Sequence, residues 1–112
     1  MRSERERVLD MLEAIERIER YAGRGREAFE RDELVQYWFV HHLALLGEAA
    51  GRLGRRFHER YPELPWHALV AMRNVLIHEY FGVDLDEIWA AVEKDVPVLK
   101  AHLEAVLSGL ED

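Results

Sequence analysis

The chain has 112 residues, a net charge of −7 and no cysteine, which suits a single domain over residues 1–112 and excludes disulfides, thiolate nucleophiles and cysteine-bound metal centres. The acidic total argues against broad, sequence-independent binding of nucleic acid, which ordinarily needs a basic surface. No apolar run approaches the ~20 residues of a membrane-spanning helix, and the first residues lead into an amphipathic segment instead of a signal-peptide core, so we expect a cytoplasmic protein without a membrane segment.

The first predicted helix runs from about Ser3 to Ala22. Apolar residues recur along it every three or four positions, and Ser3 followed by Glu6 is typical of a capping box at a helix start. Gly23 favours the end of this helix. A short linker or extra helix that carries Phe29 is expected to follow.

The second predicted helix begins after Asp32, whose side chain suits a helix cap, and carries apolar residues at helical spacing. It is expected to end near Arg60, because the prolines that follow cannot continue it. Gly47 and Gly51 lie one turn apart on this helix. Their spacing predicts that a neighbouring helix approaches closely there.

The end of the second helix carries a cluster of arginines opposed by a single acid, Glu59. The cluster has two interpretations. It is either a solvated helix end whose cations complement the helix dipole, or a patch that steers the phosphates of a nucleic acid. The cluster consists of Arg52, Arg55, Arg56 and Arg60.

The third predicted helix runs from about Pro65 to Tyr80, and the fourth begins after Asp84 or Asp86. Pro97 lies inside the apolar stripe of the fourth helix and should kink it. No segment shows the alternation of a β-strand. Helices joined by short connections predict an all-α fold, an antiparallel four-helix bundle with an extra short helix between the first two long ones as an option.

Several kinds of catalytic site are missing from the sequence. There is no Glu-x-x-His pair of the kind that binds metals in helical bundles, no His-Glu-x-x-His zinc motif and no glycine-rich phosphate loop. We therefore expect neither a metal nor a cofactor.

The most informative segment is the end of the third helix, which carries Arg73, Asn74, His78 and Tyr80 within eight residues. At 100° per residue, Tyr80 lies on the same face as Arg73, while His78 lies about 140° away from it. One straight helix therefore does not point both residues at one small target. Either the helix loosens near His78, or two copies of the chain complete the site across a two-fold axis. A plain alternative is a surface ion pair with Glu79.

The same helix has an apolar face that should pack on the core of its own chain. The polar group would then lie largely on the other side of the helix, away from that core. The apolar face consists of Leu69, Met72, Val75 and Leu76.

These residue types suit the cleavage of RNA. The imidazole of His78 titrates near neutrality, so it can take a proton from a ribose 2′-hydroxyl or give one to the leaving oxygen. The guanidinium of Arg73 stays charged and can bind the phosphate as negative charge builds up on it. The nucleophile belongs to the substrate, so this chemistry needs no metal.

The chain resembles the HepT-like toxin family of the HEPN superfamily. The Arg-x4-His pattern of Arg73 and His78 alone is a loose match, but longer strings agree with it over roughly residues 30–107. These strings are Gly47-Glu48-Ala49-Ala50, Tyr61-Pro62-Glu63-Leu64-Pro65-Trp66 and the stretch from Met72 to Asp84.

The resemblance implies a metal-independent endoribonuclease that acts as the toxin of a type II toxin–antitoxin pair. It implies a homodimer in which Arg73 and His78 meet in the interface cleft, with Asn74 as their polar neighbour and RNA as substrate. It also implies a partner, a small nucleotidyltransferase antitoxin of the MNT family, which would transfer AMP from ATP to Tyr80. An attached AMP would place negative charge beside Arg73 and block the cleft.

A second hypothesis is a non-catalytic binding module. In that case the bundle would act only as a partner of a nucleotidyltransferase, and Tyr80 would be a docking or modification site. Cleavage of RNA by the purified protein separates the two hypotheses.

Overall fold

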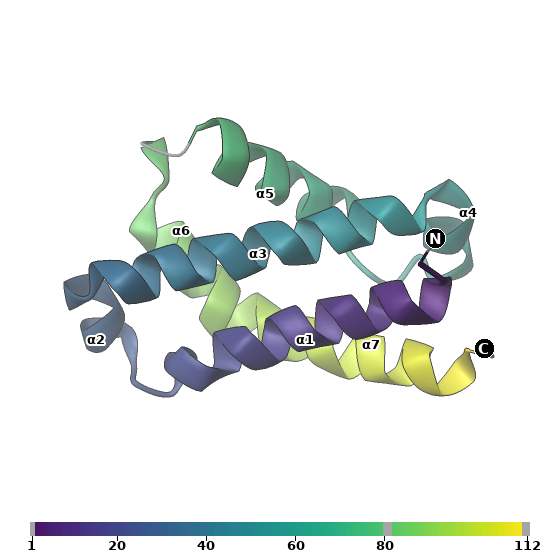
Figure 1. Ribbon diagram of the computed structural model, residues 1–112, viewed down its shortest axis with the longest axis horizontal. Coiled ribbons are helices and arrows are strands. Elements are labelled where there is room, and N and C mark those ends of the chain that lie inside the picture. The colour runs from purple at the N-terminus through teal and green to yellow at the C-terminus, as the bar shows by residue number, and fades with distance from the viewer. Residues whose placement is uncertain (1, 80–81, 111–112) are drawn as a thin grey trace.

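The computed structural model describes residues 2–79 and 82–110 of the chain, and all regular structure in these ranges is helical. Figure 1 shows the long helices in the order α5, α3, α1 and α7, each antiparallel to its neighbour. The all-α prediction is confirmed. The elements are α1 (Glu4–Ala22), α2 (Arg26–Arg31), α3 (Glu33–Leu53), α4 (Arg55–Arg60), α5 (Trp66–His78), α6 (Leu85–Ala90), the π-helical segment η2 (Ala91–Asp95) and α7 (Val96–Gly109).

A single apolar core joins the long helices. The periodic stripes read from the sequence supply it: each long helix turns residues three or four positions apart toward its neighbours, which removes them from water. The fully buried members include Val8, Met11, Ile15 and Ile18 of α1, Phe39, Leu43 and Leu46 of α3, Phe57 of α4 and Leu103 of α7.

The extra short helix between the first two long ones is present as α2. Phe29 is its buried residue, and its ring packs 5.5 Å from the rings of Phe39 and Trp89. This aromatic cluster closes one end of the molecule. The predicted capping box at Ser3 and Glu6 is also present.

One helix boundary differs from the prediction. The second long helix does not continue to Arg60: α3 ends at Leu53, and α4 is a separate short helix. Gly54 separates them with φ of 85° and ψ of 171°, a backbone conformation that is essentially restricted to glycine. The turn tucks Phe57 into the core beside Trp66, whose ring centroid lies 5.8 Å away.

The predicted fourth helix is one bent run through α6, η2 and α7. Pro97 has no backbone N–H, so the regular hydrogen-bond ladder is interrupted at this point. The N–H of Val96 donates instead to the carbonyl of Ala91, five residues earlier, which is the π-helical pattern. The bend lets Val92, Val96 and Leu99 all reach the core.

Within the described ranges, no helix combines the length and the apolar character that crossing a bilayer requires.

Candidate active site

Helix α5 carries the predicted polar group and packs chiefly on α3. The two helices are antiparallel and approach closely at Gly47: a Cβ atom placed there would lie 2.5 Å from both the Cβ of Arg73 and the carbonyl oxygen of Leu69. At Gly51 the nearest atom, Cγ2 of Val70, would be 3.4 Å away. The predicted close approach is therefore confirmed, and it is tightest at the level of Arg73.

The side chain of Arg73 lies in the seam between α3 and α5. Its Nη2 makes an ion pair with Oε1 of Glu48 at 2.8 Å, and its Nη1 donates to Oδ1 of Asn74 at 2.9 Å. The side chain is 32% exposed, and its buried Nε has no hydrogen-bond partner among the described residues.

One expectation about Arg73 was wrong, and one alternative is not what the structure shows. Arg73 does not face away from its own core, because Gly47 opens the space for its stem between the two helices. Its acidic partner is Glu48 of α3 and not the sequence neighbour Glu79. Val75, assigned to the apolar face of the helix, is 46% exposed.

Glu48 is the functional neighbour that sequence reasoning missed. Its carboxylate also accepts a hydrogen bond from Nε of Arg52 at 2.6 Å. The bond from Arg52, together with the charge of Arg73, lowers the pKa of the Glu48 carboxyl below its ordinary value. Glu48 is therefore ionised at neutral pH.

His78 is the last residue of α5 and is exposed, as is Asn74 one turn before it. The helix stays regular through His78, and the N–H of Glu79 still bonds to the carbonyl of Val75 at 2.9 Å. The helix therefore does not loosen to bring His78 toward Arg73, and in the described part of the chain no hydrogen bond joins the two. Tyr80, the predicted AMP acceptor, lies outside the described residues.

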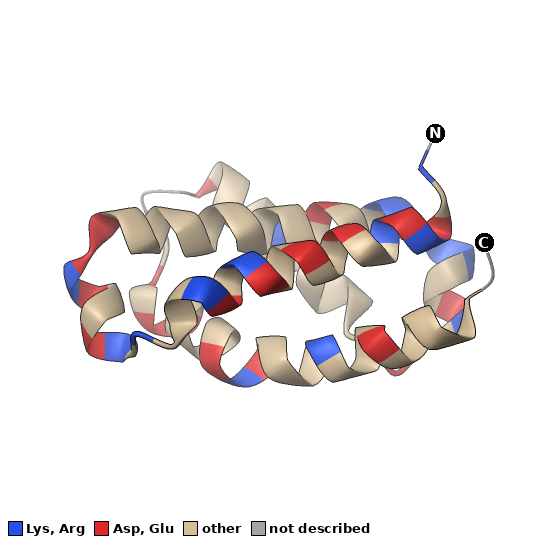
Figure 2. Ribbon diagram, turned by 60° about the horizontal axis from the view of Figure 1, so that its bottom comes forward, with Lys and Arg blue, Asp and Glu red and all other residues tan. Residues whose placement is uncertain are grey.

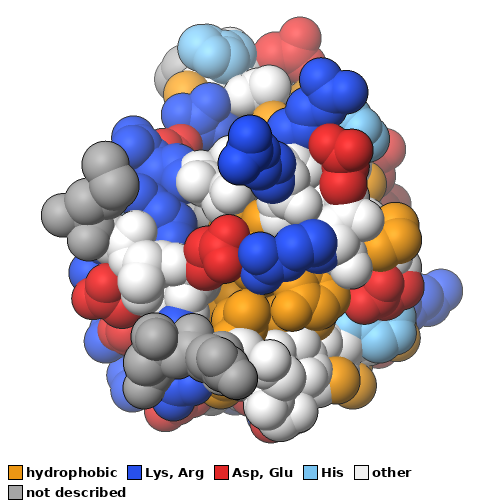
Figure 3. Space-filling view, turned by 90° about the vertical axis from the view of Figure 1, so that its right-hand side faces the viewer, with side chains coloured by type: hydrophobic (Ala, Val, Ile, Leu, Met, Phe, Trp, Pro, Cys, Tyr) orange, Lys and Arg blue, Asp and Glu red, His pale blue; other side chains and the backbone are white. Residues whose placement is uncertain are grey.

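The predicted RNA-steering arginines differ in their surroundings. Arg52 pairs with Glu48 and Arg55 pairs with Glu59 at 3.2 Å, whereas Arg56 has no ion-pair partner within residues 2–79 and 82–110. Figure 3 looks at the end of the molecule where α4 and both termini lie and shows basic side chains gathered there among a few acids. Arg60 also pairs with an acid, Glu4, at 3.1 Å, so three of the four arginines of the cluster have acidic partners, and the RNA-steering role stays a prediction.

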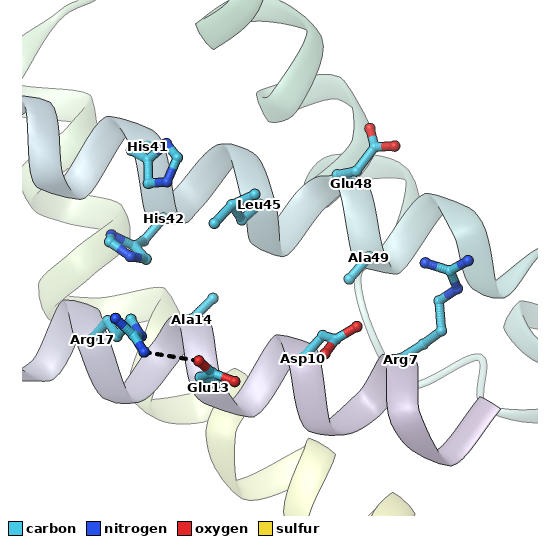
Figure 4. A pocket seen from close by; sticks show the side chains of 10 residues that line it. All are labelled: Arg7, Asp10, Glu13, Ala14, Arg17, His41, His42, Leu45, Glu48 and Ala49. Carbon is cyan, nitrogen blue, oxygen red and sulfur yellow. Dashed lines mark hydrogen bonds and ion pairs between the residues drawn. The ribbon is translucent and has the colours of Figure 1, made fainter. Parts of the chain in front are cut away.

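A hollow between α1 and α3 extends away from Glu48 (Figure 4). The ring of His42 lies at its inner wall, only 5% exposed, and its Nδ1 is 2.9 Å from the carbonyl oxygen of Trp38. Burial lowers the pKa of His42. The charged side chains that line the hollow are Arg7, Asp10, Glu13, Arg17 and Glu48.

Helix α3 has a long uncharged stretch, from Leu34 to Gly47 (Figure 2). Part of this stretch faces solvent: Leu34 is 79% exposed and Leu45 is 45% exposed. On α5, Ile77 is 49% exposed and lies one turn beyond Arg73. Leu45 also lines the hollow between α1 and α3.

No group of three or more His, Asp or Glu side chains is arranged to hold a metal ion in the described ranges.

Comparison with known proteins places the chain in a family. The family model described as Ribonuclease HepT-like matches residues 11–106, nearly the whole helical region. The chain belongs to the HepT-like ribonuclease family. The match includes the Arg73–Glu48 seam and the exposed His78, so the HepT-like region contains every described residue of the candidate site.

Two relatives with ribonuclease names agree with this assignment. A protein of Thermococcus cleftensis named "Probable ribonuclease HepT" is 38% identical over 104 residues, which cover 92% of this chain and 94% of the relative. A protein of Caldanaerobacter subterraneus named "Putative RNase TTE0752" is 38% identical over 90 residues, 80% of each chain. No solved structure shows a significant match to the chain.

Proposed function

We propose that this protein is a metal-independent endoribonuclease, the toxin of a type II toxin–antitoxin pair, and that it cleaves RNA with Arg73 and His78. The observation that carries the proposal is the guanidinium of Arg73, which is held by Glu48 and Asn74 at the solvent edge of the α3–α5 seam. Membership of the HepT-like ribonuclease family supports RNA as the substrate.

The reaction follows from these side chains. His78 takes the proton of a ribose 2′-hydroxyl, and the 2′-oxygen bonds to the adjacent phosphorus. The bond from phosphorus to the 5′-oxygen breaks, which leaves a 2′,3′-cyclic phosphate and a 5′-oxygen that receives a proton. Arg73 binds the phosphate oxygens and stabilises the charge that develops on them.

The active form in this proposal is a homodimer. Arg73 and His78 lie about 140° apart on a regular helix and do not point at one small target, so two copies of each residue line a shared cleft across a two-fold axis. Two exposed apolar residues, Leu45 one turn before Glu48 and Ile77 one turn beyond Arg73, would be covered in such a dimer. The proton for the leaving oxygen then comes from His78 of the partner subunit.

Regulation would act through Tyr80. A nucleotidyltransferase antitoxin would use ATP as the donor. The Tyr80 phenolic oxygen would give up its proton to solvent and bond to the α-phosphorus, while the bond from that phosphorus to the bridging oxygen breaks and pyrophosphate leaves. Two residues past His78, the AMP would bring negative charge and bulk to the site. Intact mass of the protein made with and without the transferase tests this step: a gain of one or more AMP units is expected, and it should disappear in Tyr80→Phe.

The test of the enzymatic proposal uses purified protein, single-stranded RNA and excess EDTA. The parent should cut the RNA to products with 2′,3′-cyclic phosphate ends, and Arg73→Ala and His78→Ala should each abolish cutting. Both variants should keep the helical circular dichroism spectrum and the mass of the parent in light scattering. A protein that binds the transferase but never cuts RNA is a non-catalytic module, and variants that cut like the parent refute the assigned roles.

A further inference from the structure

The carboxylate of Glu48 lies between two guanidinium groups. Oε1 pairs with Nη2 of Arg73 at 2.8 Å, and Oε2 accepts from Nε of Arg52 at 2.6 Å. The Glu48 side chain is 34% exposed, and Figure 4 shows its carboxylate pointing away from α1. Arg52, Glu48, Arg73 and Asn74 thus form a continuous chain of polar contacts from α3 to α5.

This chain of contacts restrains Arg73 at three points. The close approach at Gly47 fixes the start of its stem against the α3 backbone. Glu48 holds one terminal nitrogen and Asn74 holds the other. A guanidinium has five N–H donors, so further donors on the terminal nitrogens stay available for a phosphate.

A carboxylate beside a phosphate-binding arginine weakens the binding of RNA. Its negative charge repels the phosphate, so a site selected only for RNA affinity would exclude it. Its presence is explained if orientation matters more than affinity, since a fixed guanidinium stabilises the transition state without reorganising.

We infer that Glu48 is a positioning residue for RNA cleavage: it orients Arg73 toward the scissile phosphate, and Arg52 acts by holding Glu48 instead of by contacting RNA. This inference rests on the proposed ribonuclease function. It reassigns Arg52, which the sequence grouped with the RNA-steering residues.

The test separates turnover from binding. Glu48→Ala should lower kcat by about 10²-fold, the loss that a misplaced catalytic group can cause, while RNA binds as tightly as to the parent or more tightly. Glu48→Gln retains an oxygen acceptor for Arg73 and should recover much of that loss. Glu13→Ala is the matched control, because Glu13 also pairs with an arginine one turn later, Arg17, at 3.0 Å and lines the same hollow. Equal loss of kcat in Glu48→Ala and Glu48→Gln, or weaker RNA binding without loss of kcat, would overturn the inference.

The role of Arg52 can be tested separately, through the salt dependence of RNA binding. A cation that contacts RNA phosphate adds to the salt dependence of binding, about 0.7 in the slope of log K against log salt for single strands. Arg52→Ala should leave that slope unchanged and lower kcat less than Glu48→Ala does. A slope that is smaller by about 0.7 would instead show that Arg52 contacts an RNA phosphate.

A measurement without RNA keeps the inference distinct from the proposed function. In nitrogen-15 NMR spectra of the parent, the terminal guanidinium nitrogens of Arg73 should give resolved, slowly rotating signals, and these should average in Glu48→Ala but not in Glu13→Ala. If the parent shows this restraint but never cuts RNA, the ribonuclease proposal fails while the contact stands. If the Arg73 signals of the parent average like those of the exposed Arg55, the positioning role fails whatever the activity.

Discussion

Gly47 and Arg73 lie in direct contact across the seam between α3 and α5. A side-chain carbon at Gly47 would fall 2.5 Å from the Cβ of Arg73 and equally close to the backbone oxygen of Leu69. Neither atom is the far end of a flexible side chain, so a methyl group there can be accommodated only if the helices move apart. The position of Arg73 therefore depends on a residue that has no side chain.

Gly47→Ala should destabilise the protein and reduce RNA cleavage together. Overpacking of this kind typically costs about 1–3 kcal/mol of unfolding free energy, although alanine favours a helix. Gly51→Ala is the matched control: its nearest contact is 3.4 Å, so it should be neutral or stabilising by up to about 1 kcal/mol. Urea unfolding of both variants measures the difference, and equal stabilities would contradict the close contact.

Gly54→Ala should also destabilise the protein, for a different reason. Its φ of 85° with ψ of 171° costs a residue with a side chain about 1–3 kcal/mol, although the space around it is open. Gly23→Ala serves as the comparison, because Gly23 has φ of −64° and equally open surroundings. Thermal unfolding should show a lower Tm for Gly54→Ala alone. A Gly54→Ala variant as stable as the parent would mean that α3 and α4 are not separated by this backbone conformation.

A charge placed on the proposed interface should separate the subunits. Leu45→Glu and Ile77→Glu each replace an exposed apolar residue, one turn from Glu48 and one turn from Arg73 respectively, with a carboxylate whose burial against a second copy would be costly. Both variants should be monomers at micromolar concentration in light scattering and should lose RNA cleavage. Val98→Glu alters a 58% exposed residue on α7 and should remain dimeric and active. A parent that is itself monomeric would refute the composite site.

His42 should make stability depend on pH in the mildly acidic range. Its native-state pKa lies below the ordinary value of 6.5, chiefly because the ring is buried, with the charges of His41, Arg17 and Arg20 acting in the same direction. As the pH falls through 6.5, the unfolded chain takes up a proton that the native ring does not bind, so stability falls.

The size of that effect can be isolated by substitution. Each pH unit below 6.5 removes at most about 1.4 kcal/mol until the native-state pKa is reached. Urea unfolding at pH 7.5 and 5.5 should show a smaller loss in His42→Gln than in the parent. The exposed His67 on α5 is not among the groups that act on His42 and offers the control, so His67→Gln should lose as much as the parent. An unchanged loss in His42→Gln would show that His42 does not stay neutral in the native state.

Much of the fold could be predicted because its signals are local. The spacing of apolar residues located the four long helical segments, Ser3 with Glu6 marked a helix start, and Pro97 marked the bend in the last helix. The break at Gly54 was missed because glycine is tolerated inside helices, and nothing local distinguished it from Gly51. Only its backbone conformation in the folded chain separates the two.

The candidate site divides in the same way. By itself the sequence determined which chemistry is available, because residue types and short spacings are properties of the chain. It places Arg73, Asn74 and His78 at helical spacing, contains two glycines that allow a neighbouring helix to approach closely, and matches a ribonuclease family. Only the tertiary structure decided that Arg73 lies in the seam and that Glu48, 25 positions earlier, is its partner, because the packing of α5 on α3 joins residues that no local pattern relates.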